Sequence, residues 1–177
     1  MTDRDQYLTQ RYMQECFDYS KGSIFWKERP LHHFLDEWRR RIFNSRQAGT
    51  EAGTLVSGYR MVKFSWGKVG VHRIIFLMHY GFLPEEVDHI NGNPLDNKIE
   101  NLRAATHAEN LRNMKTPVSN TSGRKGVSWH KAARKWVAGI RHNGKWKHLG
   151  TFDDYSDAVK RRQDAEETIY GDFSNGR

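Results

Sequence analysis

Apolar and turn-forming residues alternate over short distances in the N-terminal part of the chain, which is the pattern of a β-rich region. Residues 17–27 predict two short strands around a Ser-Lys-Gly turn. Residues 55–71 alternate in the same way, with Gly58 and Gly67 at turn positions, and predict a second strand pair. Residues 35–43 are compatible with a short helix. We expect all of these elements to form core and scaffold.

A different order of signals begins at about residue 71 and continues to residue 113. An apolar run over residues 72–80 predicts a helix that ends at Gly81. Beyond it come signals for a strand, a loop of turn-forming residues, a second strand and a helix with a capping box, in residues 87–90, 91–97, 101–104 and 106–109. After its first helix, this segment therefore has the order strand, loop, strand, helix.

The rest of the chain predicts a small separate domain. Residues 115–123 have the composition of a linker. Three strands and a helix follow, in residues 126–129, 135–141, 145–152 and 156–170. Asn143-Gly144 is a strong hairpin signal, and the small residues Ala158 and Ala165 on one helix face favour close packing on the sheet. We expect an α+β fold with domains at residues 1–114, whose core is at about 71–113, and 124–175.

Composition and charge limit the classes of partner. The 177 residues are 37% hydrophobic and 28% charged, and they carry a net charge of +8 with a pI of about 9.7. This excess of positive charge favours a polyanionic partner, usually nucleic acid. An anionic membrane surface is less favoured, because the sequence contains no long basic amphipathic helix. The single cysteine, Cys16, excludes an internal disulfide and a CxxC zinc ribbon. Since no signal peptide or membrane span is found, we expect a cytoplasmic protein.

Asp88, His89 and Asn110 form a candidate site, because a strand end and the first turns of the following helix can bring them together. Asp and Asn supply hard oxygen ligands, which suit Mg²⁺ or Mn²⁺. A neutral histidine beside such an ion can take a proton from water near neutral pH. On spacing alone, ordinary packed or surface residues are the favoured interpretation, because Asp-His pairs are common.

Five ordered motifs change this weighing: Val71-His72-Arg73-Ile74-Ile75, Val87-Asp88-His89-Ile90-Asn91-Gly92-Asn93, Asp96-Asn97, Glu100-Asn101-Leu102-Arg103-Ala104-Ala105-Thr106 and Asn110. Together they resemble the HNH endonucleases of phages and mobile introns. The resemblance implies a ββα-metal fold that hydrolyses phosphodiester bonds in DNA with a single divalent ion, Mg²⁺ or Mn²⁺. It implies that His89 is the general base and that Asn101 braces the loop through hydrogen bonds. It also implies that Asp88 and Asn110 hold the metal.

Other polar residues near these motifs have less defined roles. The resemblance implies positioning or packing for His72, and His107 is an alternative ligand if Asn110 points away. Arg103 can pair with a phosphate or with an acidic neighbour, and we count it among the candidate DNA contacts. We expect three further histidines to belong to the scaffold: His32, His33 and His79.

Residues 120–150 are strongly basic. They contain no Asp or Glu and eight cationic side chains, at Arg124, Lys125, Lys131, Arg134, Lys135, Arg141, Lys145 and Lys147. Trp129, Trp136 and Trp146 lie between them, and we expect Trp136 to belong to the core. A basic sheet face can enter the major groove and contact phosphates and base edges.

The motifs of this segment, Lys125-Gly126-Val127, Lys135-Trp136-Val137-Ala138-Gly139-Ile140, Leu149-Gly150-Thr151-Phe152 and Asp157-Ala158, resemble the AP2/ERF DNA-binding domain. In that family the sheet reads the major groove. The resemblance implies sheet-face positions at Ser128, His130, Arg141, Trp146 and His148, and we add Lys145 as a candidate DNA contact. The chain departs from the family where arginines are usual (Ser128, His130), at an acidic position (Gly139) and at a tryptophan position (His148). The plant domain's target sequence is therefore not implied.

We expect a site-specific phage HNH homing endonuclease whose AP2-like module binds the DNA target. Its partner is double-stranded DNA, with no membrane or small-molecule cofactor, and its location is the bacterial host cytoplasm if a phage encodes it. A monomer or weak dimer with one site per chain favours a nick over a double-strand break. Two alternatives stay open, a non-catalytic sequence-specific DNA-binding regulator and an RNA-directed nuclease or RNA binder, and competition with duplex RNA separates the second.

Overall fold

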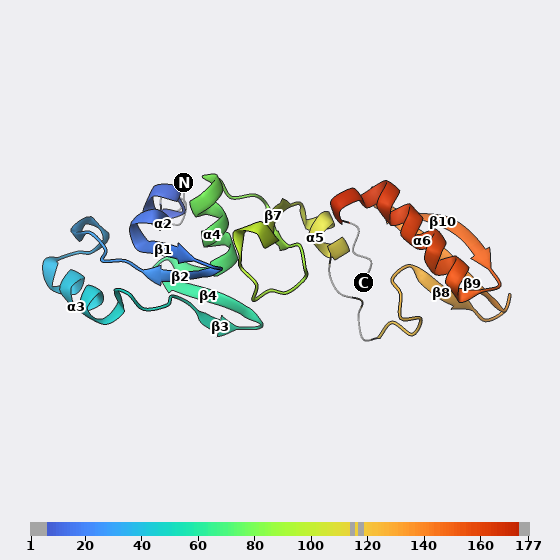
Figure 1. The fold of residues 1–177 in the computed structure, drawn as a ribbon, viewed down its shortest axis with the longest axis horizontal. Coiled ribbons are helices and arrows are strands. Elements are labelled where there is room, and N and C mark those ends of the chain that lie inside the picture. Colours follow the sequence, from blue (N-terminus) through green and yellow to red (C-terminus); the bar gives the residue numbers. More distant parts are fainter. Residues whose placement is uncertain (1–6, 114–115, 117–118, 174–177) are drawn as a thin grey trace. The chain divides into compact units, whose positions relative to one another are not determined.

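The computed structural model describes residues 7–113, 116 and 119–173, which form two compact units, Met1–Thr106 and His107–Arg177 (Figure 1). Because the division falls after Thr106, the helix expected to begin at about His107 belongs to the second unit. Parts of the sequence-based predictions fall on residues outside this description. They are the start of the first domain at residues 1–6, the domain limits at 114 and 175, and linker residues 115, 117 and 118.

Three small antiparallel sheets organise the first unit. Its elements in chain order are α2 (Gln10–Cys16), β1 (Phe17–Ser20), β2 (Ser23–Trp26), η1 (Leu31–His33), α3 (Glu37–Gln47), β3 (Thr54–Val56), β4 (Tyr59–Phe64), β5 (Gly67–Gly70), α4 (Val71–Tyr80), β6 (Glu86–His89), η2 (Ile99–Asn101) and β7 (Leu102–Ala105). Strand β1 pairs with β2, β4 lies between β3 and β5, and β6 pairs with β7.

The strand signals of the N-terminal region are confirmed, with one strand more than expected. Strands β1 and β2 join through Lys21 and Gly22, whose φ angles are 48° and 90°. The region expected to hold a second strand pair contains three strands, β3, β4 and β5. The chain turns twice there, because a tight turn at Ser57 and Gly58 with positive φ precedes β4 and a second turn precedes Gly67.

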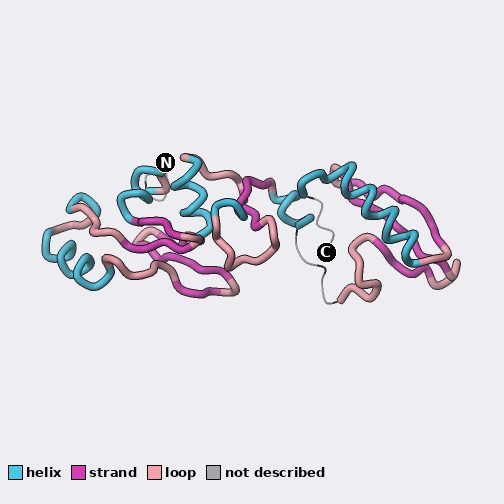
Figure 2. The backbone as a smooth tube through the Cα atoms, in the orientation of Figure 1, coloured by secondary structure: helices cyan, strands magenta, loops and turns pink. Residues whose placement is uncertain are grey.

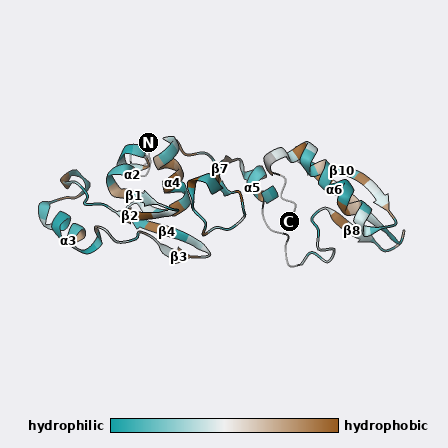
Figure 3. Cartoon of the chain, viewed as in Figure 1, coloured by the Kyte–Doolittle hydropathy of each residue, from teal (hydrophilic) through white to brown (hydrophobic). Residues whose placement is uncertain are grey.

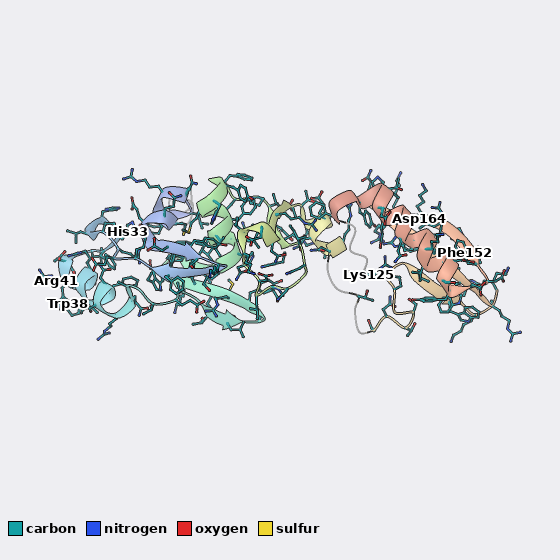
Figure 4. All side chains as sticks on the ribbon, viewed as in Figure 1. His33, Trp38, Arg41, Lys125, Phe152 and Asp164 are labelled. Atoms are coloured by element: carbon teal, nitrogen blue, oxygen red, sulfur yellow. The ribbon has the colours of Figure 1, made fainter. Side chains whose placement is uncertain are left out.

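Helix α3 departs from the expected core. It begins at Glu37, where the Asp36 side chain accepts a hydrogen bond from the Arg39 amide and caps the helix. It has no buried residue. Leu35 and Trp38 are 87% and 69% exposed, and Trp38 extends from the helix in Figure 4. The assignment of residues 35–43 to core and scaffold is therefore wrong for these two side chains.

Helix α4 forms the centre of the first unit's core. It ends at Gly81, whose φ of 78° places it in the left-handed region expected of a helix C-cap. Its apolar residues appear brown in Figure 3, and five of them are buried: Val71, Ile74, Ile75, Phe76 and Leu77. Helix α2 lies beside α4, and residues of β1, β2, β4 and β5 complete the same cluster (Figure 1). This core supports α4, from which the chain proceeds to β6.

The second unit contains the expected sheet and helix. Its elements are α5 (His107–Asn113), β8 (Val127–His130), β9 (Lys135–His142), β10 (Lys145–Phe152), α6 (Tyr155–Tyr170) and η3 (Gly171–Phe173). Figure 2 shows α6 along the antiparallel sheet, whose strand order is β10-β9-β8. At 16 residues α6 is the longest helix described, and no helix in the described part of the chain has the length and apolar composition for crossing a bilayer.

Local residue chemistry explains this arrangement. Asn143 and Gly144 join β9 to β10 with φ angles of 49° and 75°, as the hairpin signal predicted. Ala158 and Ala165 of α6 are both buried, and Ala158 packs with Val127 and Ala138 of the sheet, as expected from its small size. Trp136 packs against this core, whereas Trp129 and Trp146 are 44% and 59% exposed.

Candidate active site

Strands β6 and β7 place the candidate catalytic residues at one end of a short hairpin. Asp88 is the direct cross-strand partner of Arg103, and His89 is the partner of Leu102. Asp88 and His89 are 4% and 6% exposed, so each needs polar partners inside the fold. The loop that follows His89 contains the expected turn-forming residues and returns to β7 through η2.

Asn101 links the two sides of this loop. Its side-chain Oδ1 accepts from the Asn91 amide at 3.0 Å, and its Nδ2 donates to Asn91 Oδ1 at 3.1 Å and to the Asp96 carbonyl at 2.7 Å. The Asn91 side chain also donates to Asp96 Oδ2 at 2.7 Å. These bonds hold the start and the end of the loop together beside His89.

Asn97 is a site residue that the sequence argument missed. Its Oδ1 lies 2.9 Å from His89 Nε2, and Asn97 is only 3% exposed. Because an amide oxygen only accepts, Nε2 donates, and the neutral ring of His89 carries its lone pair on Nδ1. The motif Asp96-Asn97, which is part of the resemblance, is the sequence signal that points to Asn97.

Arg103 pairs with the acidic neighbour that the sequence left as one of two alternatives. Its Nε and Nη2 both lie 2.8 Å from Asp88 Oδ2. The two side chains are 15% and 4% exposed, so this is a largely buried ion pair. Arg103 thereby holds the Asp88 carboxylate in one orientation, which differs from the direct DNA contact for which it was selected.

His72 and Tyr59 surround His89 with two further rings. The His72 and His89 ring centroids are 5.1 Å apart, and Tyr59 lies 5.7 Å from His72 and 6.4 Å from His89. Burial lowers the pKa of His72 to about 3, and the neighbouring His89 adds to this effect. His72 is therefore neutral at physiological pH and belongs to the surroundings of the site.

The remaining candidate ligands belong to the second unit. Asn110 and His107 both lie in α5, which begins at His107 as the capping signal predicted. The first unit thus brings together Asp88, His89 and Asn101, while Asn110 comes from a separate unit.

His32 and His33 form a cluster with Glu15, and its geometry fits hydrogen bonding better than metal binding. Their Nε2 atoms lie 3.0 and 2.8 Å from Glu15 Oε2. Arg29 Nε donates to His33 Nδ1 at 3.2 Å, so the neutral His33 ring carries its proton on Nε2. His33 Nε2 therefore has no lone pair with which to bind a metal ion. Hydrogen bonds from Arg11 and His32 lower the pKa of Glu15 to about 2. His79 bonds its own helix, through Nδ1 and the Ile75 carbonyl at 2.8 Å.

The second unit has one sheet face that α6 does not cover. Opposite residues of paired strands share a face, and Val127 and Ala138 face α6. The residues expected at the sheet face all lie on the other side and are exposed: Ser128, His130, Arg141, Trp146 and His148. Lys145 pairs with His142 and does not share this face by strand alternation.

The absence of a side chain at Gly139 has a steric explanation on the same face of the sheet. A Cβ atom there would lie 2.0 Å from Cζ2 of Trp146, so the indole ring lies directly over the Gly139 backbone. Glycine in place of the family's acidic residue therefore makes room for the exposed ring of Trp146. Trp146 is also the cross-strand partner of Arg141, which lies two residues after Gly139 on β9.

The segment that contains the candidate site matches a known protein family. The HNH endonuclease family model matches residues 69–112. Protein 3.8 of Escherichia phage T7 is 41% identical over 91 residues, which are 51% of this chain and 74% of that protein. Uncharacterized HNH endonuclease L560 of Acanthamoeba polyphaga mimivirus is 31% identical over 121 residues, 67% of this chain and 62% of that protein.

The chain therefore spans about three quarters of the phage relative and less than two thirds of the mimivirus relative. No solved structure matches it. The family match covers α4, β6, the loop, β7 and nearly all of α5, which are the elements that carry Asp88, His89, Asn101 and Asn110. Members of this family generally depend on a divalent metal. The chain belongs to the HNH endonuclease family, whose members are DNA-cleaving hydrolases.

Proposed function

We propose that this HNH endonuclease is a site-specific phage homing endonuclease in which His89 is the general base and the second unit binds the DNA target. The observation that carries the catalytic part is the hydrogen bond between His89 Nε2 and Asn97 Oδ1. It leaves the lone pair on Nδ1, the nitrogen that can accept a proton from water. Asp88 is the candidate metal ligand, since its carboxylate is buried and held in one orientation by Arg103.

The reaction is the addition of water across a phosphodiester bond. His89 Nδ1 takes one proton from the water, and the hydroxide attacks phosphorus while the bond to the leaving oxygen breaks. The leaving oxygen then takes up a proton from solvent. The imidazolium of His89 is stabilised because its Nε2 donates to the amide oxygen of Asn97. Asn101 keeps the loop that carries Asn97 closed.

The carboxylate of Asp88 suits one Mg²⁺ or Mn²⁺ ion, because these ions prefer hard oxygen ligands. Both hydrogen bonds between Arg103 and Asp88 fall on Oδ2, so the guanidinium orients the carboxylate. When bound, the ion stabilises negative charge on the phosphate and on the leaving oxygen.

The test of this proposal is the conversion of supercoiled plasmid by the purified chain. We expect nicked circles with Mg²⁺ or Mn²⁺ and none with excess chelator, because a single site cuts one strand in each encounter. Restoring the ion after chelation must restore the activity. If plasmid and several large phage genomes stay intact with both ions, a non-catalytic DNA-binding regulator becomes the better account.

The uncovered face of the second unit is proposed as the AP2-like target-binding surface. It combines Arg141 and the exposed Trp146 with His130 and His148, which are donors and stacking groups suited to phosphates and base edges. No acidic residue occurs between residues 120 and 150, so a polyanion meets no repulsion from this stretch of the chain.

We expect Arg141→Ala to weaken binding of duplex DNA about 5- to 30-fold and to reduce its salt dependence, because one phosphate or base contact is lost. Fluorescence anisotropy with Ca²⁺ at several salt concentrations measures both quantities. Arg161→Ala is the matched control, since Arg161 is an exposed cation on α6 away from this face. Equal affinities of the two variants would contradict the role of the sheet.

A further inference from the structure

His72 is a polar group beside the active site to which the proposed mechanism assigns no step. It is the second residue of α4, and its ring forms a triangle with those of Tyr59 and His89, at centroid distances of 5.7 and 5.1 Å. Its Nδ1 is buried without a hydrogen-bond partner among the described residues. Its Nε2 also has no partner within that part of the chain, but it is not sealed from solvent.

This asymmetry fixes the proton of the ring. Burial lowers the pKa of His72 to about 3, so the imidazole is neutral and carries one N–H. A proton on Nδ1 would be a buried donor without an acceptor, which folded proteins avoid. The proton therefore belongs on Nε2, where water or a substrate oxygen can accept it. His72 thus presents a neutral donor beside the catalytic histidine.

Gly70 sets the orientation of this ring. A Cβ atom at Gly70 would lie 2.5 Å from His72 Cε1 and 2.9 Å from Nδ1, so this edge of the ring lies against the Gly70 backbone. The φ and ψ angles of Gly70 are −66° and 137°, which any residue adopts. Gly70 is therefore needed here for the space it leaves to His72 and not for its backbone conformation.

We propose that His72 is a substrate-contacting residue, whose Nε2–H donates a hydrogen bond to a phosphate oxygen of the DNA strand that His89 cuts. The inference rests on the proposed function, in which the scissile phosphate approaches His89. Packing alone does not explain a histidine here, because a phenyl ring would fill the space without burying an unpartnered nitrogen. A neutral donor also contacts the phosphate without adding a second cation beside the metal ligand.

The test compares His72→Phe with His72→Gln in single-turnover plasmid nicking with Mg²⁺. The Phe variant keeps the ring and removes the donor, so we expect its rate to fall about 10- to 100-fold, the range of a hydrogen bond to a charged group. The Gln variant keeps a neutral N–H donor and should recover at least part of that loss. Both variants should melt within a few degrees of the unsubstituted chain.

Gly70→Ala supplies a second, independent variant. The added methyl group displaces the His72 ring without changing any histidine or tyrosine of the site. We therefore expect a loss of nicking rate similar to that of His72→Phe. Between about pH 5.5 and 8.5 the pH profile of His72→Phe should keep the shape of the unsubstituted profile, because His72 does not titrate there.

Three outcomes would overturn the inference: unchanged nicking by His72→Phe, a Gln variant as slow as the Phe variant, or a Phe profile that has lost its acidic limb. The last would make His72 a titrating base. Failure of the proposed function is distinct from these. It would appear as an unsubstituted chain that does not nick DNA, or as a His89→Ala variant that nicks at the same rate.

Discussion

Plasmid nicking by His89→Ala falls by a factor of about 10² to 10⁴, while its affinity for duplex DNA in Ca²⁺ stays within about threefold of the unsubstituted value. The loss equals the rate enhancement that a positioned general base supplies. Alanine removes the nitrogen that accepts the proton but leaves Asp88 and Asn101 unchanged. Single-turnover nicking gives the rate, and anisotropy gives the affinity. The affinity should be kept because the DNA-binding surface proposed for the second unit does not include His89.

His79→Ala is the matched control, since His79 is an exposed histidine of the same unit that bonds its own helix carbonyl. Its nicking rate should be unchanged. Asn97→Ala should fall between the two variants, because it keeps the imidazole of His89 but removes the acceptor of Nε2. A His89→Ala variant that nicks as fast as His79→Ala would remove His89 from the mechanism.

The elements that the sequence predicted correctly are those with local signals. The cap at Gly81, the Asn143-Gly144 turn and the turn at Lys21-Gly22 are each set by residues that adopt positive φ. The exposure of Leu35 and Trp38 depends on which faces meet in three dimensions. Periodicity reports apolar spacing, and it does not report whether another element covers the apolar face.

The same distinction applies to the active site. Asp88 and His89 were found from an ordered motif, and they are adjacent in the chain. The partners that orient them come from later positions, because Asn97 follows across the loop and Arg103 lies opposite on β7. Those contacts depend on the register of a hairpin, which a motif alone does not give. The charge of Arg103 makes it a candidate DNA contact, and the register shows that it meets Asp88.

Glu166 in α6 is the shared counter-ion of two buried arginines in the second unit. Its carboxylate accepts from Arg124 and lies 2.9–3.0 Å from Nη2 and Nε of Arg162. The three side chains are each 7% exposed, and Arg162 Nη1 also donates to the Gly139 carbonyl at 2.8 Å. One carboxylate therefore serves two buried guanidinium groups and ties α6 to the centre of β9.

We expect Glu166→Gln to lower the free energy of unfolding of the second unit by about 3–5 kcal/mol, because two buried cations lose their counter-ion. For a unit of this size the melting temperature should fall by more than about 10 °C, which circular dichroism measures. Glu167→Gln, at the exposed neighbouring position, is the control and should change it by less than about 2 °C. A matching small shift in Glu166→Gln would show that water replaces the carboxylate as the partner of the two arginines.

Above the lowered transition, the variant should lose its affinity for DNA while the first unit stays folded, because Gly139 and Trp146 share the strands that Glu166 supports.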